Sequence, residues 1–432
     1  ATYPTPDIAH WDLSISDERN DADYKEVQSL VEQKYLDAAL ALLNKKIEEL
    51  PKEASPIILK AFVLHEKGLA KESLENLLIA FKMERQHPAL HFAFCQIYRK
   101  LGIAKISDRA CIIAAQQHHR NPLAHYEYAQ TLMAMGNSME ALKELTHAEN
   151  LDKKNSSYPY KKGMIFIYQN KIDEAEKSFK KALFVNEKNI EAAYQLAYLY
   201  ATQDKVELSK TYVNKVLDMG LQHPKVESAK LLRDYIFKNQ IRKLPKKIAP
   251  QKYHLGLSKS LYQKKEYGLA LIEIETAAKL NPTDLKTQEI LIGMYSLFLR
   301  LDKAEKALIR LIESANDKDP LKSRSYQEWG DIAVLQGKMK AAKERYDKAK
   351  ELGDPQGIAK TTLKEFPDLS TPIDKLPLNP NELFINPANS LNRKGEIFAH
   401  FGMHQRALGI YSLVLRMDPS NLTALLNMAT AN

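Results

Sequence analysis

Residues Ser157–Asn189 read SYPYKKGMIFIYQNKIDEAEKSFKKALFVNEKN, and residues Asn121–Asn155 read NPLAHYEYAQTLMAMGNSMEALKELTHAENLDKKN. Both stretches carry small and bulky apolar residues at matching intervals, with Ala141 in one and Ala175 in the other, 34 residues apart. Self-similarity at a fixed period indicates a repeat architecture, in which each unit buries its apolar face against its neighbours.

The same 34-residue register fits ten stretches, which together cover 340 of the 432 residues. They are copies 1 to 10, at 20–53, 54–87, 88–121, 122–155, 156–189, 190–223, 251–284, 285–318, 323–356 and 388–421. Position 20 of every copy is small: Ala39, Ser73, Ser107, Ala141, Ala175, Ser209, Ala270, Ala304, Ala342 and Ala407. Because small side chains let two helices approach closely, we expect position 20 to be buried inside a helix pair.

This pattern resembles the tetratricopeptide repeat, a 34-residue helix-turn-helix unit. Position 8 is also mostly small, as at Gly163, whereas position 24 carries bulk, as at Phe179. The resemblance implies an all-α fold, a right-handed α-solenoid of about ten helix pairs in two lobes, without strands.

The composition points away from the common enzyme classes. Only 15 of 432 residues are Gly, and none of the motifs GxxxxGK[ST], GxGxxG, GxSxG or HExxH occurs. No run of 18 apolar residues is present, so no membrane span is expected. We therefore predict a non-catalytic protein with no cofactor and no metal.

Two breaks interrupt the repeats. Segment 224–250 begins like a helix, but Pro245 and Pro250 fall where a second helix would run and would break it. The segment therefore predicts one unpaired helix followed by a basic linker, and a boundary between two lobes. Segment 357–387 is rich in proline and predicts a short helix followed by an extended apolar stretch. A loop of that length either packs along copies 9 and 10 or enters a groove as an internal pseudo-ligand.

The two ends differ in character. Residues 1–19 contain Pro4 and Pro6 and are typical of a flexible arm. Residues 422–432 are apolar on one side and resemble the start of an eleventh first helix. Because a solenoid end needs a polar cap, we expect the native chain to continue or a partner to cover this end.

The resemblance implies that the first helix of each pair lines a concave groove, mainly at positions 2, 5, 9, 12 and 13. Tyr and Met suit peptide grooves because they offer a large contact area with a polar tip or an adaptable shape. We expect Tyr160, Tyr194 and Tyr198 to be partly exposed there; the alternative is that these tyrosines pack between adjacent first helices. The predicted groove residues are Phe92, Arg99, Tyr126, Gln130, Met133, Tyr160, Met164, Tyr168, Tyr194 and Tyr198.

Some members of the family clamp the acidic C-terminal tails of chaperones with Lys, Asn and Arg from three consecutive units. Copies 3 to 5 supply other residues at those positions, namely Phe92, Gln96, Glu127, Ser157 and Lys161. Copies 7 to 9 likewise supply Leu255, Lys259, Ile290, Arg324 and Glu328. A carboxylate clamp for chaperone tails is therefore not expected.

Positive charge is concentrated in one part of the chain. Residues 224–284 hold 13 Lys and Arg against 6 Asp and Glu, which gives +7 of the net +9. This patch either binds nucleic acid or an acidic glycan, or keeps a linker solvated. Its core is Lys238, Arg242, Lys243, Lys246, Lys247 and Lys252.

The cysteines and histidines suggest no metal site. Cys95 and Cys111 occupy core positions 8 and 24 of copy 3, and we expect two separate buried thiols there. Five histidines gather near the turns of copies 2 to 4, where no Cys or carboxylate is in a matching register. We expect these to be surface residues: His87, His91, His118, His119 and His125.

The sequence thus predicts a protein–protein interaction scaffold that binds a partner segment in its concave groove. The resemblance alone suggests a bacterial secretion, pilus, flagellar or envelope-assembly complex as its setting. The alternative function is binding of a polyanion, RNA or an acidic polysaccharide, through the basic segment 238–252. We expect a soluble protein of the cytoplasm or the bacterial periplasm.

Overall fold

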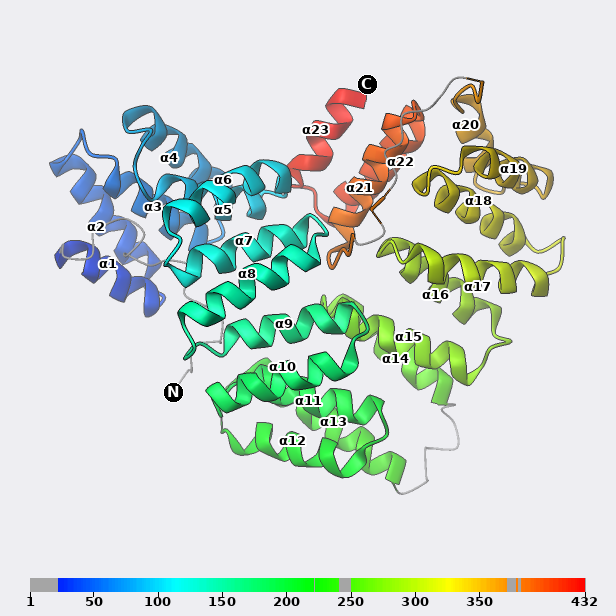
Figure 1. Ribbon diagram of the computed structural model, residues 1–432, viewed down its shortest axis with the longest axis horizontal. Coiled ribbons are helices and arrows are strands. Elements are labelled where there is room, and N and C mark those ends of the chain that lie inside the picture. Colours follow the sequence, from blue (N-terminus) through cyan, green and yellow to red (C-terminus); the bar gives the residue numbers. More distant parts are fainter. Residues whose placement is uncertain (1–21, 221, 241–249, 371–377, 380–381, 432) are drawn as a thin grey trace. The chain divides into compact units, whose positions relative to one another are not determined.

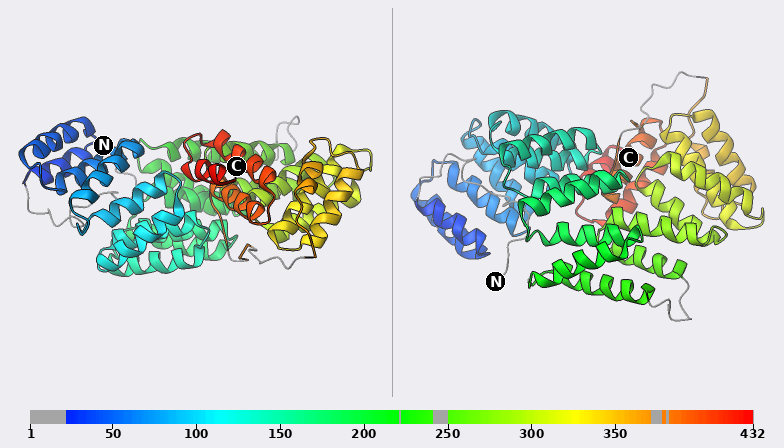
Figure 2. Two further views of the ribbon diagram at one scale, coloured as in Figure 1. Left: turned by 90° about the horizontal axis from the view of Figure 1, so that it is seen from above. Right: turned by 60° about the horizontal axis from the view of Figure 1, so that its bottom comes forward.

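The computed structural model describes residues 22–220, 222–240, 250–370, 378–379 and 382–431 (Figure 1). Within these ranges the regular structure is entirely helical and contains no strand. The chain divides into two compact units, Ala1–Arg242 and Lys243–Asn432. The molecule is therefore all-α, and within each unit helix pairs stack one after another as in a solenoid (Figures 1 and 2).

The first unit is built from successive antiparallel helix pairs, each within one of copies 1 to 6. Helix α13 (Pro224–Gln240) follows them and packs mainly on α12. The pairs are α1 (Ala22–Glu32) with α2 (Leu36–Glu49), α3 (Ser55–Glu66) with α4 (Ala70–Met83), α5 (Leu90–Lys100) with α6 (Ala104–Gln117), α7 (Pro122–Ala134) with α8 (Ser138–Leu151), α9 (Ser157–Tyr168) with α10 (Ile172–Val185), and α11 (Ile190–Thr202) with α12 (Val206–Asp218).

The second unit repeats this construction with an interruption. Helix α20 (Ile358–Lys364) lies in the 357–387 segment, and α23 (Leu422–Ala431) follows the last pair. The pairs are α14 (Pro250–Gln263) with α15 (Tyr267–Leu280), α16 (Leu285–Leu297) with α17 (Leu301–Ser314), α18 (Pro320–Leu335) with α19 (Met339–Glu351), and α21 (Pro387–His400) with α22 (His404–Met417).

A left-handed residue at position 15 of each copy follows the end of the first helix. In copy 3, for example, the N–H of Ile103 donates to the carbonyl of Tyr98 at 2.8 Å, across Gly102 with φ 80°. This geometry caps the carbonyls at the helix end and turns the chain into the second helix. The ten position-15 residues all have positive φ: Lys34, Gly68, Gly102, Gly136, Asn170, Asp204, Lys265, Leu299, Gly337 and Gly402.

The core of each pair lies where the small residues were expected. All ten residues at position 20 are 0% exposed, which confirms the predicted burial. Where this residue is Ser, its hydroxyl donates to the position-8 carbonyl of the facing helix, as from Ser209 to Ala197 at 2.7 Å. A Ser therefore fits as well as Ala because its polar atom has a partner inside the contact.

The described parts of segment 357–387 pack on the neighbouring helix pairs. Phe384 is buried with side chains of α18, α19, α21 and α22. The N–H of Leu378 donates to the carbonyl of Leu335 at 3.1 Å. These contacts agree with the interpretation that the segment lies along copies 9 and 10.

Candidate functional site

The predicted groove residues lie on four consecutive first helices, α5, α7, α9 and α11, which we call the first-helix wall. Six of them are buried. Tyr160, Tyr194 and Tyr198 are only 8%, 6% and 2% exposed, which contradicts the exposure expected for them. The buried six are Phe92, Tyr126, Met133, Tyr160, Tyr194 and Tyr198. The four that stay partly exposed are Arg99, Gln130, Met164 and Tyr168.

The buried rings belong to the packing between helices. The Tyr160 ring lies 5.8 Å from the Phe179 ring, and the Tyr126 ring lies 6.0 Å from the Tyr158 ring. The Lys225 ammonium from α13 sits 4.8 Å from the centre of the Tyr194 ring. The prediction of an exposed tyrosine groove was wrong because these rings pack against neighbouring side chains in the core.

Arg99 joins α5 to α7. Its guanidinium forms an ion pair with the Glu127 carboxylate and donates to the Glu127 carbonyl at 3.0 Å. Glu127 is 0% exposed, so this ion pair stabilises a charge that would be costly to bury alone. A third, longer contact is a hydrogen bond from Arg99 to the Thr131 hydroxyl at 3.4 Å. The arginine side chain is therefore held in one orientation at the edge of the wall.

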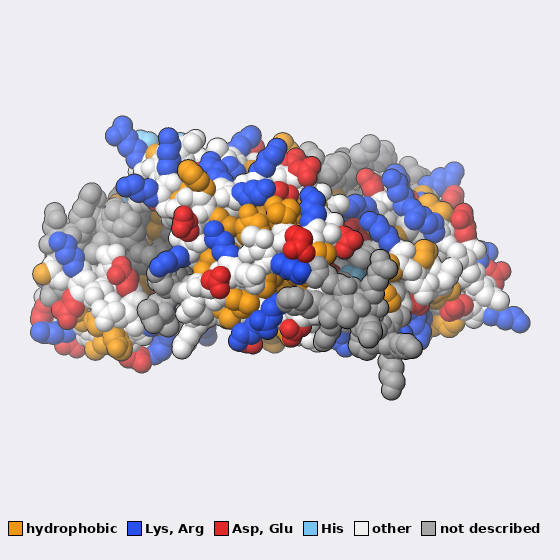
Figure 3. Space-filling model, turned by 90° about the horizontal axis from the view of Figure 1, so that it is seen from below, with side chains coloured by type: hydrophobic (Ala, Val, Ile, Leu, Met, Phe, Trp, Pro, Cys, Tyr) orange, Lys and Arg blue, Asp and Glu red, His pale blue; other side chains and the backbone are white. Residues whose placement is uncertain are grey.

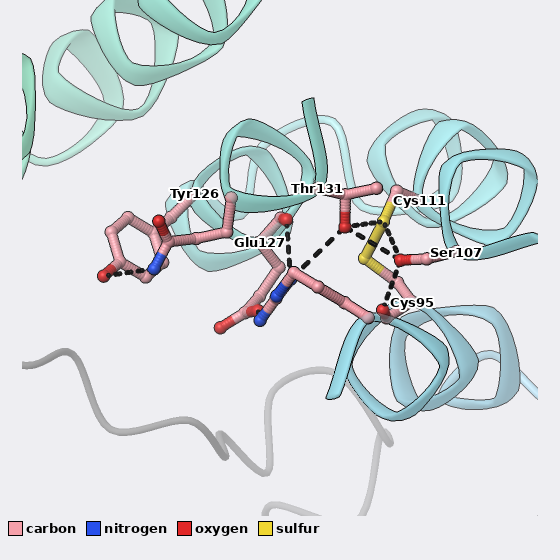
Figure 4. A network of polar contacts seen from close by, with 8 residues as sticks. Cys95, Ser107, Cys111, Tyr126, Glu127 and Thr131 are labelled. Carbon is pink, nitrogen blue, oxygen red and sulfur yellow. Dashed lines mark hydrogen bonds and ion pairs between the residues drawn. A yellow bond between two sulfur atoms is a disulfide. The ribbon is translucent and has the colours of Figure 1, made fainter. Parts of the chain in front are cut away.

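The same network reaches the cysteines, which form a disulfide (Figure 4). The Thr131 hydroxyl lies 2.8 Å from Ser107 Oγ and 3.2 Å from Cys111 Sγ, and Ser107 donates to the Cys95 carbonyl at 2.6 Å. The expectation of two separate thiols was wrong. The Cα atoms of Cys95 and Cys111 are only 4.8 Å apart, within the range that a disulfide requires.

Two of the five histidines are not surface residues, so that expectation was wrong for His87 and His125. The Ser55 hydroxyl lies within hydrogen-bond distance of His87 Nε2, at 2.9 Å. His125 Nδ1 lies 2.6 Å from Glu144 Oε2. Burial alone would lower the pKa of His125, but the Glu144 carboxylate and the His119 carbonyl raise it. In the described ranges, no three His, Cys, Asp or Glu side chains come together in a way that would hold a metal ion.

Most of the predicted basic patch lies outside the described residues. Residues 241–249, which include Arg242, Lys243, Lys246 and Lys247, lie outside the described residues, as does the side chain of Lys238. Lys252, at the start of α14, is exposed. On the face drawn in Figure 3, Lys and Arg lie interspersed with Asp, Glu and hydrophobic side chains.

A family model described as tetratricopeptide repeat matches residues 160–220, which span α9 to α12. Residues 160–220 are therefore similar to tetratricopeptide repeats. No curated protein matches the chain. Among the described residues, no helix combines the length and apolar character needed to cross a membrane.

Three solved structures illustrate the low level of similarity that the comparison finds. A tetratricopeptide repeat protein from Parabacteroides merdae is 17% identical over 72% of this chain and 97% of its own, with a TM-score of 0.33. YrrB, a tetratricopeptide repeat protein with an unusual peptide-binding site, is 20% identical over 44% of this chain and 97% of its own, with a TM-score of 0.33. PilF of Pseudomonas aeruginosa is 11% identical over 50% of this chain and 98% of its own, with a TM-score of 0.41.

Proposed function

We propose that this tetratricopeptide repeat protein is a non-catalytic scaffold that binds a segment of another protein on its first-helix wall. The observation that supports the proposal is the set of four partly exposed side chains on α5, α7 and α9: Arg99, Gln130, Met164 and Tyr168. Arg, Met and Tyr are the side chains that protein interfaces favour, because they combine a large contact area with polar or adaptable tips.

The proposed surface is pre-organised. Arg99 is anchored by the buried Glu127, and the Gln130 amide donates to the Tyr126 hydroxyl at 3.1 Å. The buried tyrosines support the wall from behind rather than contacting the partner. A rigid surface of this kind lowers the ordering cost of binding, because the scaffold does not have to fix its own side chains when the partner arrives.

For the setting, we propose a bacterial secretion, pilus, flagellar or envelope-assembly complex, on the resemblance of the repeats alone. The Cys95–Cys111 disulfide supports an oxidising compartment, because such bonds persist in the periplasm and outside the cell and are rare in the cytosol. Mass spectrometry of the protein isolated with its thiols blocked tests this point. Two blocked cysteines would contradict the proposed compartment.

A photo-crosslinking amino acid placed at Tyr168 tests the binding surface in cells. Met139, which is 56% exposed on α8, gives the matched control position. We expect a discrete crosslinked partner from position 168 and none from position 139. The partner identified in this way should then bind Met164→Ala/Tyr168→Ala about 30-fold more weakly, the loss typical of anchor residues, and Met139→Ala as well as wild type.

The polyanion alternative predicts a different pattern. Binding would then fall steeply with salt, because each phosphate contact releases counterions. It would be lost on replacing Lys243, Lys246 and Lys247, and it would be unaffected by changes on the first-helix wall. Loss of binding on replacing the lysines, or binding that is unaffected by changes on the first-helix wall, would overturn the proposed scaffold function.

A further inference from the structure

Helices α4 and α6 carry an apolar patch that faces solvent. Leu78 and Ile79 on α4 are 43% and 51% exposed, and Ile112 and Ile113 on α6 are 36% and 37% exposed. Both helices pack on α5 in the first unit. Met83 on α4 and Ile106 on α6 are also exposed. We call these six residues the α4–α6 patch.

The repeat fold does not require this patch. Its four central residues occupy positions 25 and 26 of copies 2 and 3. In each of the other eight copies at least one of these two positions is polar or charged. Single exposed apolar residues are ordinary, but a group on two neighbouring helices marks a surface that another molecule covers.

Charges beside the patch indicate what that molecule is. Position 22 is the exposed Glu75 on α4 and the exposed Arg109 on α6, so one register position carries opposite charges on the two helices. A second copy related by a twofold axis that runs along the helices would place α4 of each chain on α6 of the other, in the same direction. Glu75 would then meet Arg109 twice, and the Leu78–Ile79 pair would meet the Ile112–Ile113 pair twice.

This self-complementarity is the property that a twofold interface needs, because each chain presents the same surface to the other. Lys71 and Lys105, one turn earlier, are also exposed and carry like charges. In this arrangement they would lie at the solvent-exposed rim, where water and salt screen their repulsion.

We propose that α4 and α6 form an isologous interface with a second copy of this chain. The interface lies on the second helices of copies 2 and 3, so it leaves the first-helix wall of each chain available to a different partner. The result is a scaffold with two equivalent binding walls. The proposal does not depend on the identity of that partner.

Sedimentation equilibrium of the purified chain over a wide concentration range tests the proposal. The expected mass is twice 49.2 kDa at high concentration, and Ile79→Glu/Ile113→Glu should weaken dimerisation at least tenfold. The matched control Met139→Glu, at an exposed apolar residue of α8, should leave the dimer unchanged. A wild-type chain that stays monomeric overturns the proposal, as does a dimer that tolerates both patch substitutions or is lost equally in the control.

Charge reversal provides a second test that does not alter the apolar residues. Arg109→Glu should weaken the dimer because it places two carboxylates together, and Glu75→Arg/Arg109→Glu should restore it. No recovery in the double variant overturns the interface as described. A chain that remains monomeric but binds vesicles of anionic phospholipid would assign the patch to a membrane surface and would also overturn the proposal.

Discussion

At the scale of single residues, positions 8 and 24 face each other across a helix pair, and their sizes compensate. Where position 24 is aromatic, position 8 is Gly, because an added Cβ would lie 2.3–2.6 Å from a ring atom. Where position 24 is Leu, position 8 tolerates Ala, as in the Ala129–Leu145 pair of copy 4. The Gly–aromatic pairs are Gly163–Phe179, Gly330–Tyr346 and Gly395–Tyr411.

This contact predicts opposite effects for the same substitution at two helical glycines. Gly163→Ala would place its Cβ 2.6 Å from the ring of Phe179, which is 0% exposed, so overpacking should lower the free energy of unfolding by about 1–3 kcal/mol. Gly409→Ala on α22 meets nothing within 4 Å and should raise it by about 0.5–1 kcal/mol, because Ala loses less backbone entropy in a helix. Urea unfolding measures both.

A compensating variant controls for unrelated damage at the first site. Gly163→Ala/Phe179→Leu recreates the Ala–Leu combination of copy 4 and should recover part of the lost stability. If Gly163→Ala proves stabilising, like Gly409→Ala, the close contact with Phe179 does not limit this helix pair.

The same pair of positions contained the signal for the disulfide. The sequence places Cys95 at position 8 and Cys111 at position 24 of one copy, and the periodicity marks both as core. What periodicity does not provide is which core positions touch each other. Once positions 8 and 24 are known to face each other, two cysteines there are within bonding distance. This contact was missed because each position was interpreted by its own burial.

At the scale of helices, α18, α19, α21 and α22 meet around one buried carboxylate. Asp331 is 0% exposed and accepts hydrogen bonds from the Tyr346 hydroxyl at 2.6 Å, from Arg406 at 2.6 Å and from Lys394 at 3.2 Å. Burial alone would raise the pKa of Asp331, but Arg406 and Lys394 outweigh it and lower the pKa from 3.8 to about 2. This network ties the ninth helix pair to the tenth across the long 357–387 segment.

Removing this charge should destabilise the second unit. Asp331→Asn removes the nearest counterion of Lys394 and Arg406 and leaves Lys394 only its longer ion pair with Glu328 at 4.0 Å. Breaking a buried pair in this way costs about 3–5 kcal/mol. Asp347→Asn on α19 removes an exposed pair with Lys343 and should change the free energy of unfolding by less than about 1 kcal/mol. Chemical denaturation at pH 7 compares the two variants with wild type.

The effect should depend on pH with a fixed sign. Because folding lowers the pKa of Asp331, its stabilisation is present above 3.8 and is lost as the pH falls from 3.8 through about 2. The difference between wild type and Asp331→Asn should therefore shrink in that window. A difference that stays constant from pH 7 to pH 2 would contradict the role assigned to the ionised carboxylate.

Element-scale features differ in how far the sequence predicts them. The Ala and Ser series at position 20 placed the helix pairs, because close packing inside a pair is a local requirement of each copy. The exposure of the first-helix wall was not predicted correctly. The Lys225 ammonium lies 4.8 Å from the Tyr194 ring, and it comes from α13, a helix outside the 34-residue register. The repeat positions alone therefore do not predict this contact. The basic segment was predicted from charge alone, and its core lies outside the described residues.

At the scale of the whole molecule, each unit contains its own stabilising device. The Cys95–Cys111 disulfide lies in the first unit, and the Asp331 network lies in the second. Repeats in a solenoid are stabilised mainly by their neighbours, so a local change is felt over short distances along the chain. The two units are therefore expected to unfold in separate steps, each sensitive to only one of the two devices.

Two variants with one fluorescent probe test this expectation. The chain has two tryptophans, so Trp11→Phe leaves Trp329, held in the second unit by Glu305 and Arg345, as the reporter of that unit. Far-UV circular dichroism follows the helices of both units. Cys95→Ala/Cys111→Leu introduces the Ala–Leu combination of copy 4 but removes a crosslink between residues 16 apart. Loss of the crosslink should lower the free energy of unfolding by about 3 kcal/mol. That variant should shift part of the dichroism transition and leave the Trp329 transition in place, whereas Asp331→Asn should shift the Trp329 transition. If both variants moved both signals together, the units would unfold as one cooperative body, because stability would then be shared along the whole chain.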